Sequence, residues 1–340
     1  TNGTLVITSG TEASISVDIS SDVEAEGDET LIVTIQPALN TANAQHTLTI
    51  VEGSVEPALQ LTATQSNTRV TTIYPQLGQV DIELTIHNKE LSEIDFVDWS
   101  TSSSALNALN VSTFDTAFSF APNSLDEGLY HVRVEVSDNA GLTSEAEITL
   151  AVNSAPPQLT GEDTDGDGVP DNQEGIGDND GDGIPNYLDA NDECNVQLMG
   201  STTTSSYLIE GGAGACFRIG DTAASNRTNS IVIDEGNVAA DEGFTSIGET
   251  IDFVINGLPN KGTVYRLVIP QQNVVPSNAV YRKYNAASNG WNEFVVTGNN
   301  DALHSTKGEQ GICPPPSATS WTEGLNAGDW CVRLTLSDGG

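Results

Sequence analysis

Two acidic loops in residues 163–189 carry the side chains best suited to chemistry, and that chemistry is the binding of a hard cation. Each loop places oxygen-bearing side chains at positions 1, 3, 5, 9 and 12. In the first loop these are Asp163, Asp165, Asp167, Asp171 and Glu174. In the second, fifteen residues later, they are Asp178, Asp180, Asp182, Asn186 and Asp189. Gly168 and Gly183 at position 6 permit a sharp turn, and the carbonyls of Val169 and Ile184 would supply the ligands of position 7.

The spacing favours calcium over a solvated acidic linker, which is the alternative interpretation. Calcium takes six to eight oxygen ligands, and a chain wrapped round one ion presents them at alternate positions. A random acidic run does not repeat such spacing. The shorter Asp189 stands at position 12 of the second loop where Glu is usual, so we expect a different number of ligands there.

The loops are not predicted to lie between two helices. Pro156, Pro157 and Gly161 leave no room for an entering helix, and Pro170 and Pro185 lie inside the loops. The segment resembles thrombospondin type 3 repeats, in which calcium ions form the core. The resemblance implies a segment that is extended without metal, because its charges repel one another, and a stiff spacer with calcium.

Composition narrows the function. The 340 residues suggest two or three domains, and the net charge of −37 with only eleven Lys and Arg argues against nucleic acid and anionic membranes as partners. No apolar run approaches the roughly 18 residues of a membrane span. The sequence has no signal peptide or initiator Met, so we expect a processed or excised piece of a longer protein.

The four cysteines favour disulfides and an oxidising compartment over free cytosolic thiols, because they form no CxxC pattern. Four cysteines allow three connectivities. We predict Cys194–Cys216 and Cys313–Cys331, since each pair is close in sequence and closes a short loop. Loosely built calcium sites also suit the millimolar calcium outside cells. The chain is therefore expected to be extracellular.

Alternating apolar residues predict an all-β fold of tandem β-sandwich modules joined by the calcium-binding segment. The expected divisions are 1–54, 55–153, 154–193 and 194–340. Strand patterns include Leu31 to Ile35, Val80 to Ile86, Tyr130 to Val136 and Ala146 to Val152. The run VYRKYNAASNGWNEFVV predicts a hairpin in the last division.

The stretch SDVEAEGDETLIVTI resembles the Calx-beta domain, whose pattern has acids at Asp22, Glu26 and Glu29. Ser21 departs from that pattern, so no calcium site is assigned here. The resemblance covers only the later half of such a domain. Either the sequence begins in mid-domain, or another chain supplies the missing strands by β-strand addition and so forms a head-to-tail polymer.

Two further resemblances concern the remaining divisions. FSFAPNSLDEGLYHVRVEVSDNAGLTSEAEITLAV resembles PKD and related immunoglobulin-like modules of bacterial surface proteins, and implies a spacer. VYRKYNAASNGWNEFV, GICPPP and AGDWCVRLTLSDGG resemble bacterial choice-of-anchor surface domains, and imply a place on the cell surface. Trp99 is expected in a core, and His87 and His131 in solvent.

No catalytic constellation is present: the sequence lacks GxSxG, HExxH and P-loop motifs, so we do not expect an enzyme. The function predicted is a calcium-stabilised structural or adhesive protein of the bacterial cell surface, whose partners are copies of itself or surface glycans. The alternative is a carbohydrate-binding accessory region of a larger secreted protein or enzyme. Trp321, in a polar stretch, is the best candidate for an exposed aromatic that stacks on sugar rings.

Overall fold

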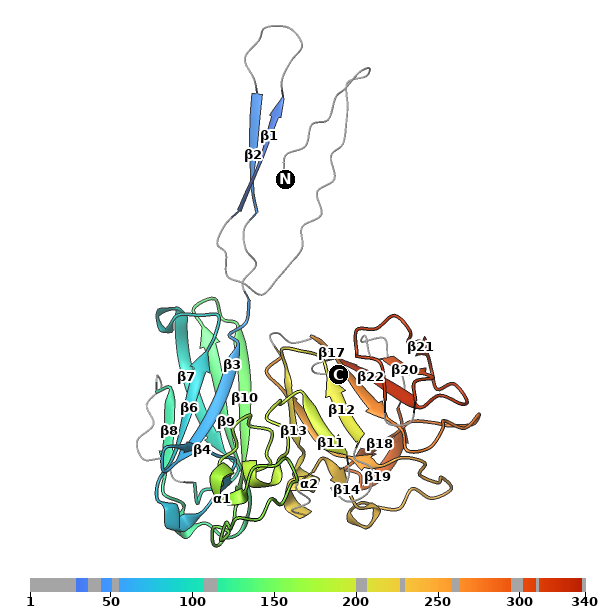
Figure 1. The fold of residues 1–340 in the computed structure, drawn as a ribbon. Helices are drawn as coiled ribbons and strands as arrows, with labels where there is room; N and C mark the ends of the chain where they lie inside the picture. Colours follow the sequence, from blue (N-terminus) through green and yellow to red (C-terminus); the bar gives the residue numbers. More distant parts are fainter. Residues whose placement is uncertain are drawn as a thin grey trace, which may run out of the picture. The chain divides into compact units, whose positions relative to one another are not determined.

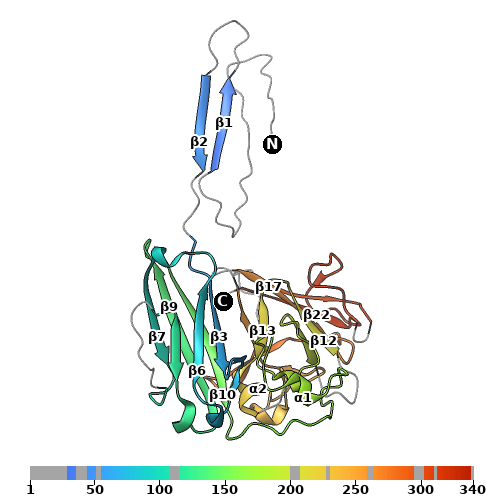
Figure 2. The same cartoon turned by 60° about the vertical axis from the view of Figure 1, so that its left-hand side comes forward.

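In a computed structural model the chain divides into two compact units, Thr1–Gly53 and Ser54–Gly340. The structure describes residues 29–35, 44–50, 55–106, 115–199, 207–226, 230–258, 263–294, 302–309 and 312–337. Regular structure in these ranges is almost entirely β-strand, as Figures 1 and 2 show, so the predicted all-β class is confirmed.

The first unit contains an antiparallel hairpin of β1 (Glu29–Ile35) and β2 (Ala44–Ile50). Its register places Leu31 opposite Leu48. β1 coincides with the predicted alternating run Leu31 to Ile35. Asp22 and Glu26, which carry part of the Calx-beta resemblance, and Ser21, which departs from it, lie outside the described residues.

Residues 55–153 of the second unit form two four-stranded sheets. The first sheet has the order β4-β3-β6-β8. Its strands are β3 (Leu59–Gln65), β4 (Thr68–Arg69), β6 (Val80–Ile86) and β8 (Ala117–Phe120). The second sheet has the order β5-β10-β9-β7. Its strands are β5 (Thr72–Ile73), β7 (Ile94–Thr101), β9 (Gly128–Asp138) and β10 (Thr143–Val152).

A hydrophobic core of two clusters, both contacted by Leu61 and Trp99, joins these two sheets into a sandwich, here called the 55–153 sandwich. Val80 and Ile82 of β6 are fully buried together with Val132 of β9 and Leu150 of β10. The intervening residues of β6 face solvent, which confirms the predicted period of two. Trp99 packs against this core, as expected.

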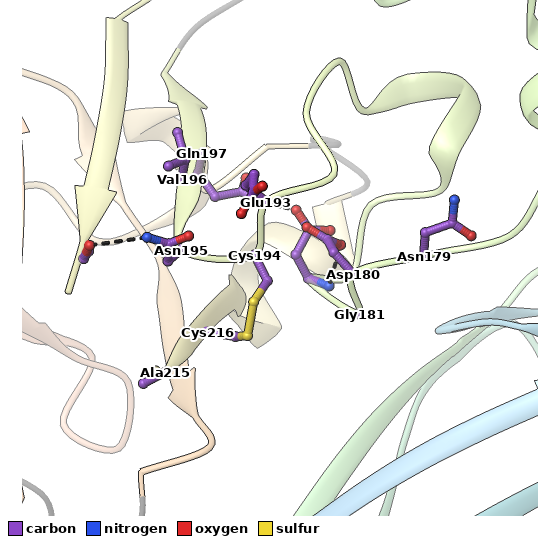
Figure 3. Close-up of a disulfide and its surroundings, with 12 residues drawn as sticks. Asn179, Asp180, Gly181, Glu193, Cys194, Asn195, Val196, Gln197, Ala215 and Cys216 are labelled. Carbon is purple, nitrogen blue, oxygen red and sulfur yellow. Dashed lines mark hydrogen bonds between the residues drawn. A yellow bond between two sulfur atoms is a disulfide. The ribbon is translucent and has the colours of Figure 1, made fainter. Parts of the chain in front are cut away.

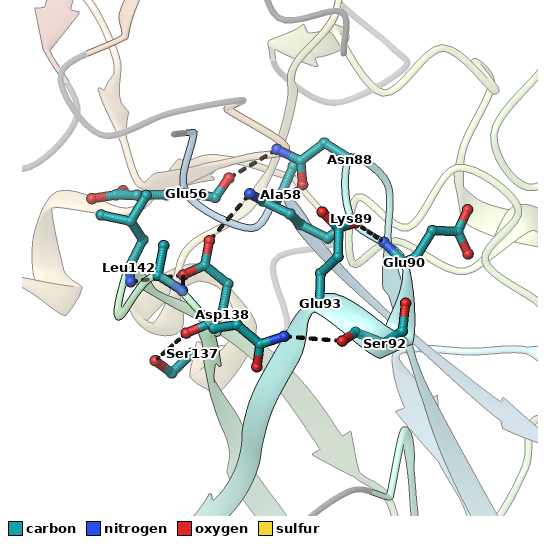
Figure 4. A network of polar contacts seen from close by, with 12 residues as sticks. Glu56, Ala58, Asn88, Lys89, Glu90, Ser92, Glu93, Ser137, Asp138 and Leu142 are labelled. Atoms are coloured by element: carbon teal, nitrogen blue, oxygen red, sulfur yellow. Dashed lines mark hydrogen bonds and ion pairs between the residues drawn. The ribbon is translucent and has the colours of Figure 1, made fainter. Parts of the chain in front are cut away.

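A polar network fixes one end of the sandwich, at the turn after β9 (Figure 4). The buried Asp138 accepts hydrogen bonds from the backbone N–H groups of Ala140 and Leu142, both at 2.9 Å, and its other oxygen lies 3.1 Å from Lys89 Nζ. Burial opposes ionisation of Asp138, but these donors outweigh it and lower the pKa of its carboxyl.

The helices of the described chain are short. The α-helices are α1 (Asp171–Glu174) and α2 (Asp221–Asn226). The 3-10 helices are η1 (Pro75–Leu77), η2 (Leu91–Glu93), η3 (Pro122–Ser124), η4 (Asn186–Leu188) and η5 (Glu235–Asn237). Among the helices that the structure describes, none has the length and apolar character that a membrane span requires.

Residues 194–337, here called the C-terminal segment, centre on a sheet of order β11-β12-β17-β22-β20-β21. Its strands are β11 (Val196–Met199), β12 (Tyr207–Gly211), β17 (Val264–Pro270), β20 (Ala302–Thr306), β21 (Thr322–Glu323) and β22 (Cys331–Ser337). Three strand pairs accompany the sheet. They are β13 (Cys216–Ile219) with β16 (Phe253–Asn256), β14 (Val232–Ile233) with β15 (Thr250–Ile251), and β18 (Arg282–Asn285) with β19 (Gly290–Glu293).

The C-terminal segment agrees with the sequence in two details. The predicted hairpin is present as β18–β19, with Tyr284 opposite Trp291. The disulfides are Cys194–Cys216 and Cys313–Cys331, the pairing that short loops predicted.

Two expectations about single side chains are wrong. Trp321 is not an exposed platform: it is 8% exposed, because its ring packs with Val268 and Cys331 and its Nε1 donates to Pro315 O at 3.1 Å. His131 is not fully solvated. Its Nε2 lies 3.5 Å from Asp221 of α2, which packs against β9 and β10.

Candidate metal centre

The two acidic loops fold into the same turn. In the first, both oxygens of Asp163 accept backbone N–H groups, from Gly166 at 2.8 Å and Gly168 at 3.1 Å. In the second, Asp178 accepts the N–H groups of the equivalent glycines 181 and 183, at 2.6 and 3.1 Å. The glycines have φ between +80° and +100°, a conformation that glycine adopts without strain. The sequence repeat is thus also a repeat in three dimensions.

The carboxylates at positions 3 and 5 also make the same hydrogen bonds in both loops. Asp165 and Asp180 each accept the N–H two residues ahead at 3.1 Å. Asp167 and Asp182 do the same at 2.6 and 2.7 Å. Each bond occupies one carboxylate oxygen and turns the chain round the three side chains of its loop.

The three carboxylates of each loop converge. Ligand oxygens of Asp163, Asp165 and Asp167 lie within 4.8 Å of one another, and so do those of Asp178, Asp180 and Asp182. Two oxygens bound to one calcium ion at about 2.4 Å can be no more than about 4.8 Å apart. The separations therefore match a shared cation.

Within the two loops, three buried carboxylate oxygens have no hydrogen-bond partner: Asp165 Oδ2, Glu174 Oε2 and Asp180 Oδ2. Buried polar atoms are nearly always paired, and an unpaired anionic oxygen is costly. These atoms belong to position 3 of both loops and position 12 of the first, which are ligand positions. A bound cation would satisfy all three.

The electrostatics of the loops also favour a cation. Burial, reinforced by neighbouring carboxylates, raises the pKa of Glu174, of Asp180 and of Asp189 to about 7. Burial likewise raises the pKa of Asp165, Asp178 and Asp182. For Glu174 the neighbours include Asp165 and Asp167, and for Asp189 they include Asp180 and Asp178. The position-12 residues, Glu174 and Asp189, therefore lie within the electrostatic field of their own loops, and their role as ligands stays a prediction.

The residues at position 9 brace their loops from within. Asp171 accepts from the N–H and the hydroxyl of Thr164, both at 2.8 Å. Asn186 Oδ1 accepts the N–H of Asn179 at 2.9 Å. Pro170 and Pro185 precede the short helices α1 and η4, which present these side chains. It stays a prediction that Asp171 and Asn186 also serve as metal ligands. The same holds for the backbone carbonyls of Val169 and Ile184.

The loops differ in their surroundings, which the sequence did not reveal. In the first loop Asp163 and Asp167 are exposed. In the second, Asp178 is 1% exposed and Asp182 is fully buried. The second loop lies between the 55–153 sandwich and the C-terminal segment.

The 55–153 sandwich contacts the beginning of the second loop. The hydroxyl of Thr71 donates to Asp178 Oδ2, and the N–H of Asp178 donates to Arg69 O at 3.0 Å. Arg69 Nη1 donates to Asn179 O at 2.6 Å. The Arg69 guanidinium also lies so close to Gly181 that a Cβ there would collide with it.

The C-terminal segment contacts the middle of the same loop. The N–H of Ile219 donates to Asp182 O at 2.8 Å, and Gln197 Nε2 donates to Asp182 Oδ2. Figure 3 shows the Cys194–Cys216 disulfide together with residues 179–181 of the loop. Cys216 begins β13, the strand that ends at Ile219, and Cys194 O accepts the N–H of Phe217 at 2.9 Å. The disulfide therefore ties the end of the acidic segment to the strand that holds Asp182.

The donor set fits calcium. The converging groups are carboxylates without His or Cys, a set that suits hard cations such as calcium and magnesium. Residues 163, 165, 167 and 174 would hold one ion, and residues 178, 180, 182 and 189 a second. A bound ion would neutralise carboxylates that otherwise repel one another.

No protein-family model and no curated protein sequence matches the chain. Among solved structures, the crystal structure of the Protocadherin GammaB4 extracellular domain is similar at 11% sequence identity with a TM-score of 0.28. The match covers 84% of this chain and 41% of that chain, so this chain spans about two fifths of that protein's length. A TM-score this low carries no argument about fold or function.

Proposed function

We propose that this chain is an extracellular, calcium-stabilised structural or adhesive protein, in which the acidic segment is a metal-dependent joint between β-sandwich-type modules. One observation carries the proposal: both loops make the same bonds round converging carboxylates and leave ligand oxygens buried without partners. Such loops are unfavourable as bare anions and stable round cations. The proposed role is not catalytic.

The second loop supplies the mechanism of the joint. Asp178 is held by Thr71 of the 55–153 sandwich, and Asp182 by Gln197 and Ile219 of the C-terminal segment. An ion shared by Asp178 and Asp182 would therefore link both neighbours through its own coordination shell. Without the ion, repulsion among the buried carboxylates works against the same contacts.

Two disulfides and no free cysteine among the described residues support an extracellular location, where disulfides persist. The sandwich at residues 55–153 supports the proposed PKD or immunoglobulin-like spacer. We extend the proposal to a bacterial cell surface and to the choice-of-anchor resemblance of residues 194–340, which rest on the sequence motifs.

The partner that we propose is a second copy of this chain. In the described part of the first unit, β1 and β2 pair with each other in a two-stranded sheet. An isolated hairpin of this kind is marginally stable in water. Strands added by a neighbouring copy would stabilise it and would produce a head-to-tail filament.

The experiment is calcium titration and small-angle scattering on the full chain, in millimolar calcium and after chelation. We expect two bound ions, and a radius of gyration that grows on chelation as the joint loosens. Electron microscopy of the same samples distinguishes fibres from single particles. Absence of calcium binding would overturn the metal centre, and binding without any change in dimensions would overturn the joint. Single particles at all concentrations would overturn only the proposal that the chain forms a filament.

A cavity in the C-terminal segment favours a second candidate, carbohydrate binding. It has a volume of about 970 Å³, and its lining includes Phe244, Tyr281, Tyr284 and Trp291. Phe244 is 50% exposed, and Arg282 lies over its ring at 4.1 Å. Aromatic faces beside polar groups suit sugar rings.

Phe244→Ala tests this candidate, with Leu208→Ala as a control at another exposed apolar side chain of the segment. Retention of the wild-type chain and of Leu208→Ala on a glycan panel, with loss for Phe244→Ala, would support carbohydrate binding. Equal behaviour of all three would reject this cavity as the site.

A further inference from the structure

A pair of arginines lies on the outer face of the six-stranded sheet. Tyr265, Leu267 and Ile269 of β17 face the core of the C-terminal segment. Because strand residues alternate between faces, Arg266 lies on the opposite face. Arg333 of β22 is opposite Val268, and Arg266 is opposite Thr335, so the two arginines are diagonal neighbours on one face.

A histidine completes the cluster. His304 of β20 is directly opposite Arg333 in the register, so its side chain lies on the same face. Burial, followed by the charge of Arg333, lowers the pKa of His304, and Arg266 acts in the same direction. Burial and Arg266 likewise lower the pKa of Arg333. These three side chains are here called the Arg266–Arg333–His304 cluster: the two arginines are like charges, and they favour the neutral form of His304.

No ion pair neutralises the cluster among the described residues, although the charge of Glu323 raises the pKa of His304 against the larger effects of burial and Arg333. Glu210 is opposite Val268 and Glu323 is opposite His304, yet neither forms an ion pair with any of the three side chains. In a chain with 48 acids and eleven Lys and Arg, two adjacent arginines that form no ion pair with a described residue are conspicuous. Like charges side by side on a sheet are destabilising.

Arg333 is held in a fixed orientation. Its Nη1 donates to Pro316 O at 2.9 Å, and its guanidinium carbon lies 5.2 Å from the centre of the Trp321 ring. Arg333 Nε and His304 Nδ1 are buried without a hydrogen-bond partner. Arg266 is exposed. The cluster thus combines one preorganised guanidinium, one accessible guanidinium and unsatisfied polar nitrogens.

We propose that the Arg266–Arg333–His304 cluster binds a single carboxylate or sulfate group of a small acidic ligand, such as an acidic sugar. Guanidinium groups present parallel N–H donors that match the oxygens of such anions. The anion would neutralise the repulsion between the arginines. A small ligand fits better than a polyanion or a second copy, because the net charge of −37 repels highly charged partners.

The test uses the full chain in millimolar calcium, with glucuronate and inorganic sulfate as probes in isothermal titration at constant ionic strength. We expect one saturable site for at least one probe. Arg266→Gln should weaken binding roughly tenfold or more, because it removes a charge-assisted contact. Arg133→Gln, at an exposed arginine of β9, is the matched control and should leave affinity unchanged.

Arg333→Lys is a second variant that keeps the charge but removes the planar donor pair, and it should also weaken binding. Thermal unfolding in chloride checks that each variant folds. The proposal is overturned if neither probe saturates a site, or if Arg266→Gln binds as wild type does. It is also overturned if a sulfated polysaccharide binds at this cluster while the single-group probes do not.

Discussion

The backbone N–H of Ile219 donates a hydrogen bond of 2.8 Å to the carbonyl of Asp182. This bond connects β13, the strand that begins at the disulfide-bonded Cys216, to a residue whose carboxylate belongs to the second acidic cluster. A candidate metal ligand is therefore part of the contact between the acidic segment and the C-terminal segment. The first loop has no counterpart of this bond among the described residues.

Gly168 and Gly183 provide a matched pair of mutations that tests the joint. They occupy the same loop position with φ of +100° and +99°. A Cβ at Gly168 would meet nothing within 4 Å, whereas at Gly183 it would lie 2.7 Å from Ile219 Cγ1. Both Ala variants should lose about 1–2 kcal/mol through backbone strain. Gly183→Ala should lose more, because Ile219 must move.

The measurement for this pair is urea unfolding in calcium, together with hydrogen exchange at the amide of Ile219. Faster exchange at Ile219 is expected in Gly183→Ala alone. Equal destabilisation of both variants, with unchanged exchange, would show that the second loop does not hold β13.

Replacing one position-3 ligand should remove one ion. Asp165→Asn and Asp180→Asn each remove a carboxylate oxygen that is buried without a partner. Each variant should bind one calcium ion tightly instead of two, because calcium affinity depends on the number of charged ligands. Isothermal titration measures the stoichiometry. Asp95→Asn, at an exposed acid in β7, is the control and should retain both ions.

The metal-free protein should become more stable as the pH falls from 7 towards 5. The folded-state pKa values of Glu174, Asp180 and Asp189 are raised to about 7, above the roughly 4 of an unfolded chain. In this range the folded protein binds protons that the unfolded chain does not, so the free energy of unfolding rises as pH falls. Calcium affinity should fall over the same range, because protons compete for the carboxylates.

Urea unfolding in chelator at several pH values measures this dependence. The triple variant Glu174→Gln, Asp180→Asn, Asp189→Asn is the control and should lose part of the rise, because Asp165, Asp178 and Asp182 also have raised pKa values. The lowered pKa of Asp138 acts in the opposite direction, but its contribution is lost only as pH falls through that pKa, below about 4. Metal-free stability that is constant or falls between pH 7 and 5 would contradict the prediction.

The two disulfides should differ in their effect on the joint. They span 22 and 18 residues, so removing either one should cost about 3 kcal/mol. The Cys194→Ala, Cys216→Ala variant should also enlarge the protein in scattering with calcium, because that bridge ties the acidic segment to β13. The Cys313→Ala, Cys331→Ala variant should unfold more easily with unchanged dimensions. Equal dimensions of both variants in scattering would show that the Cys194–Cys216 disulfide does not hold the joint together.

Local features were predictable from the sequence because they depend on nearby residues. The period of two in Val80 to Ile86 appears as alternating burial in β6. The carboxylates of Asp163, Asp165 and Asp167 converge because alternate positions of a tight loop face one centre. The short strands β11, β12, β13, β20 and β21 were not predicted, since their apolar runs are short and their pairing is long-range.

The sequence by itself determined the all-β class, the two repeated acidic loops and the disulfide pairing, because spacing along the chain sets strand faces, loop ligands and short bridges. Only the tertiary structure decided that the second loop is buried between Thr71 and Ile219, while Asp163 and Asp167 of the first are exposed. It also placed Trp321 in a core and Arg266 beside Arg333. These relationships depend on which distant segments pack together, and linear spacing does not encode that packing.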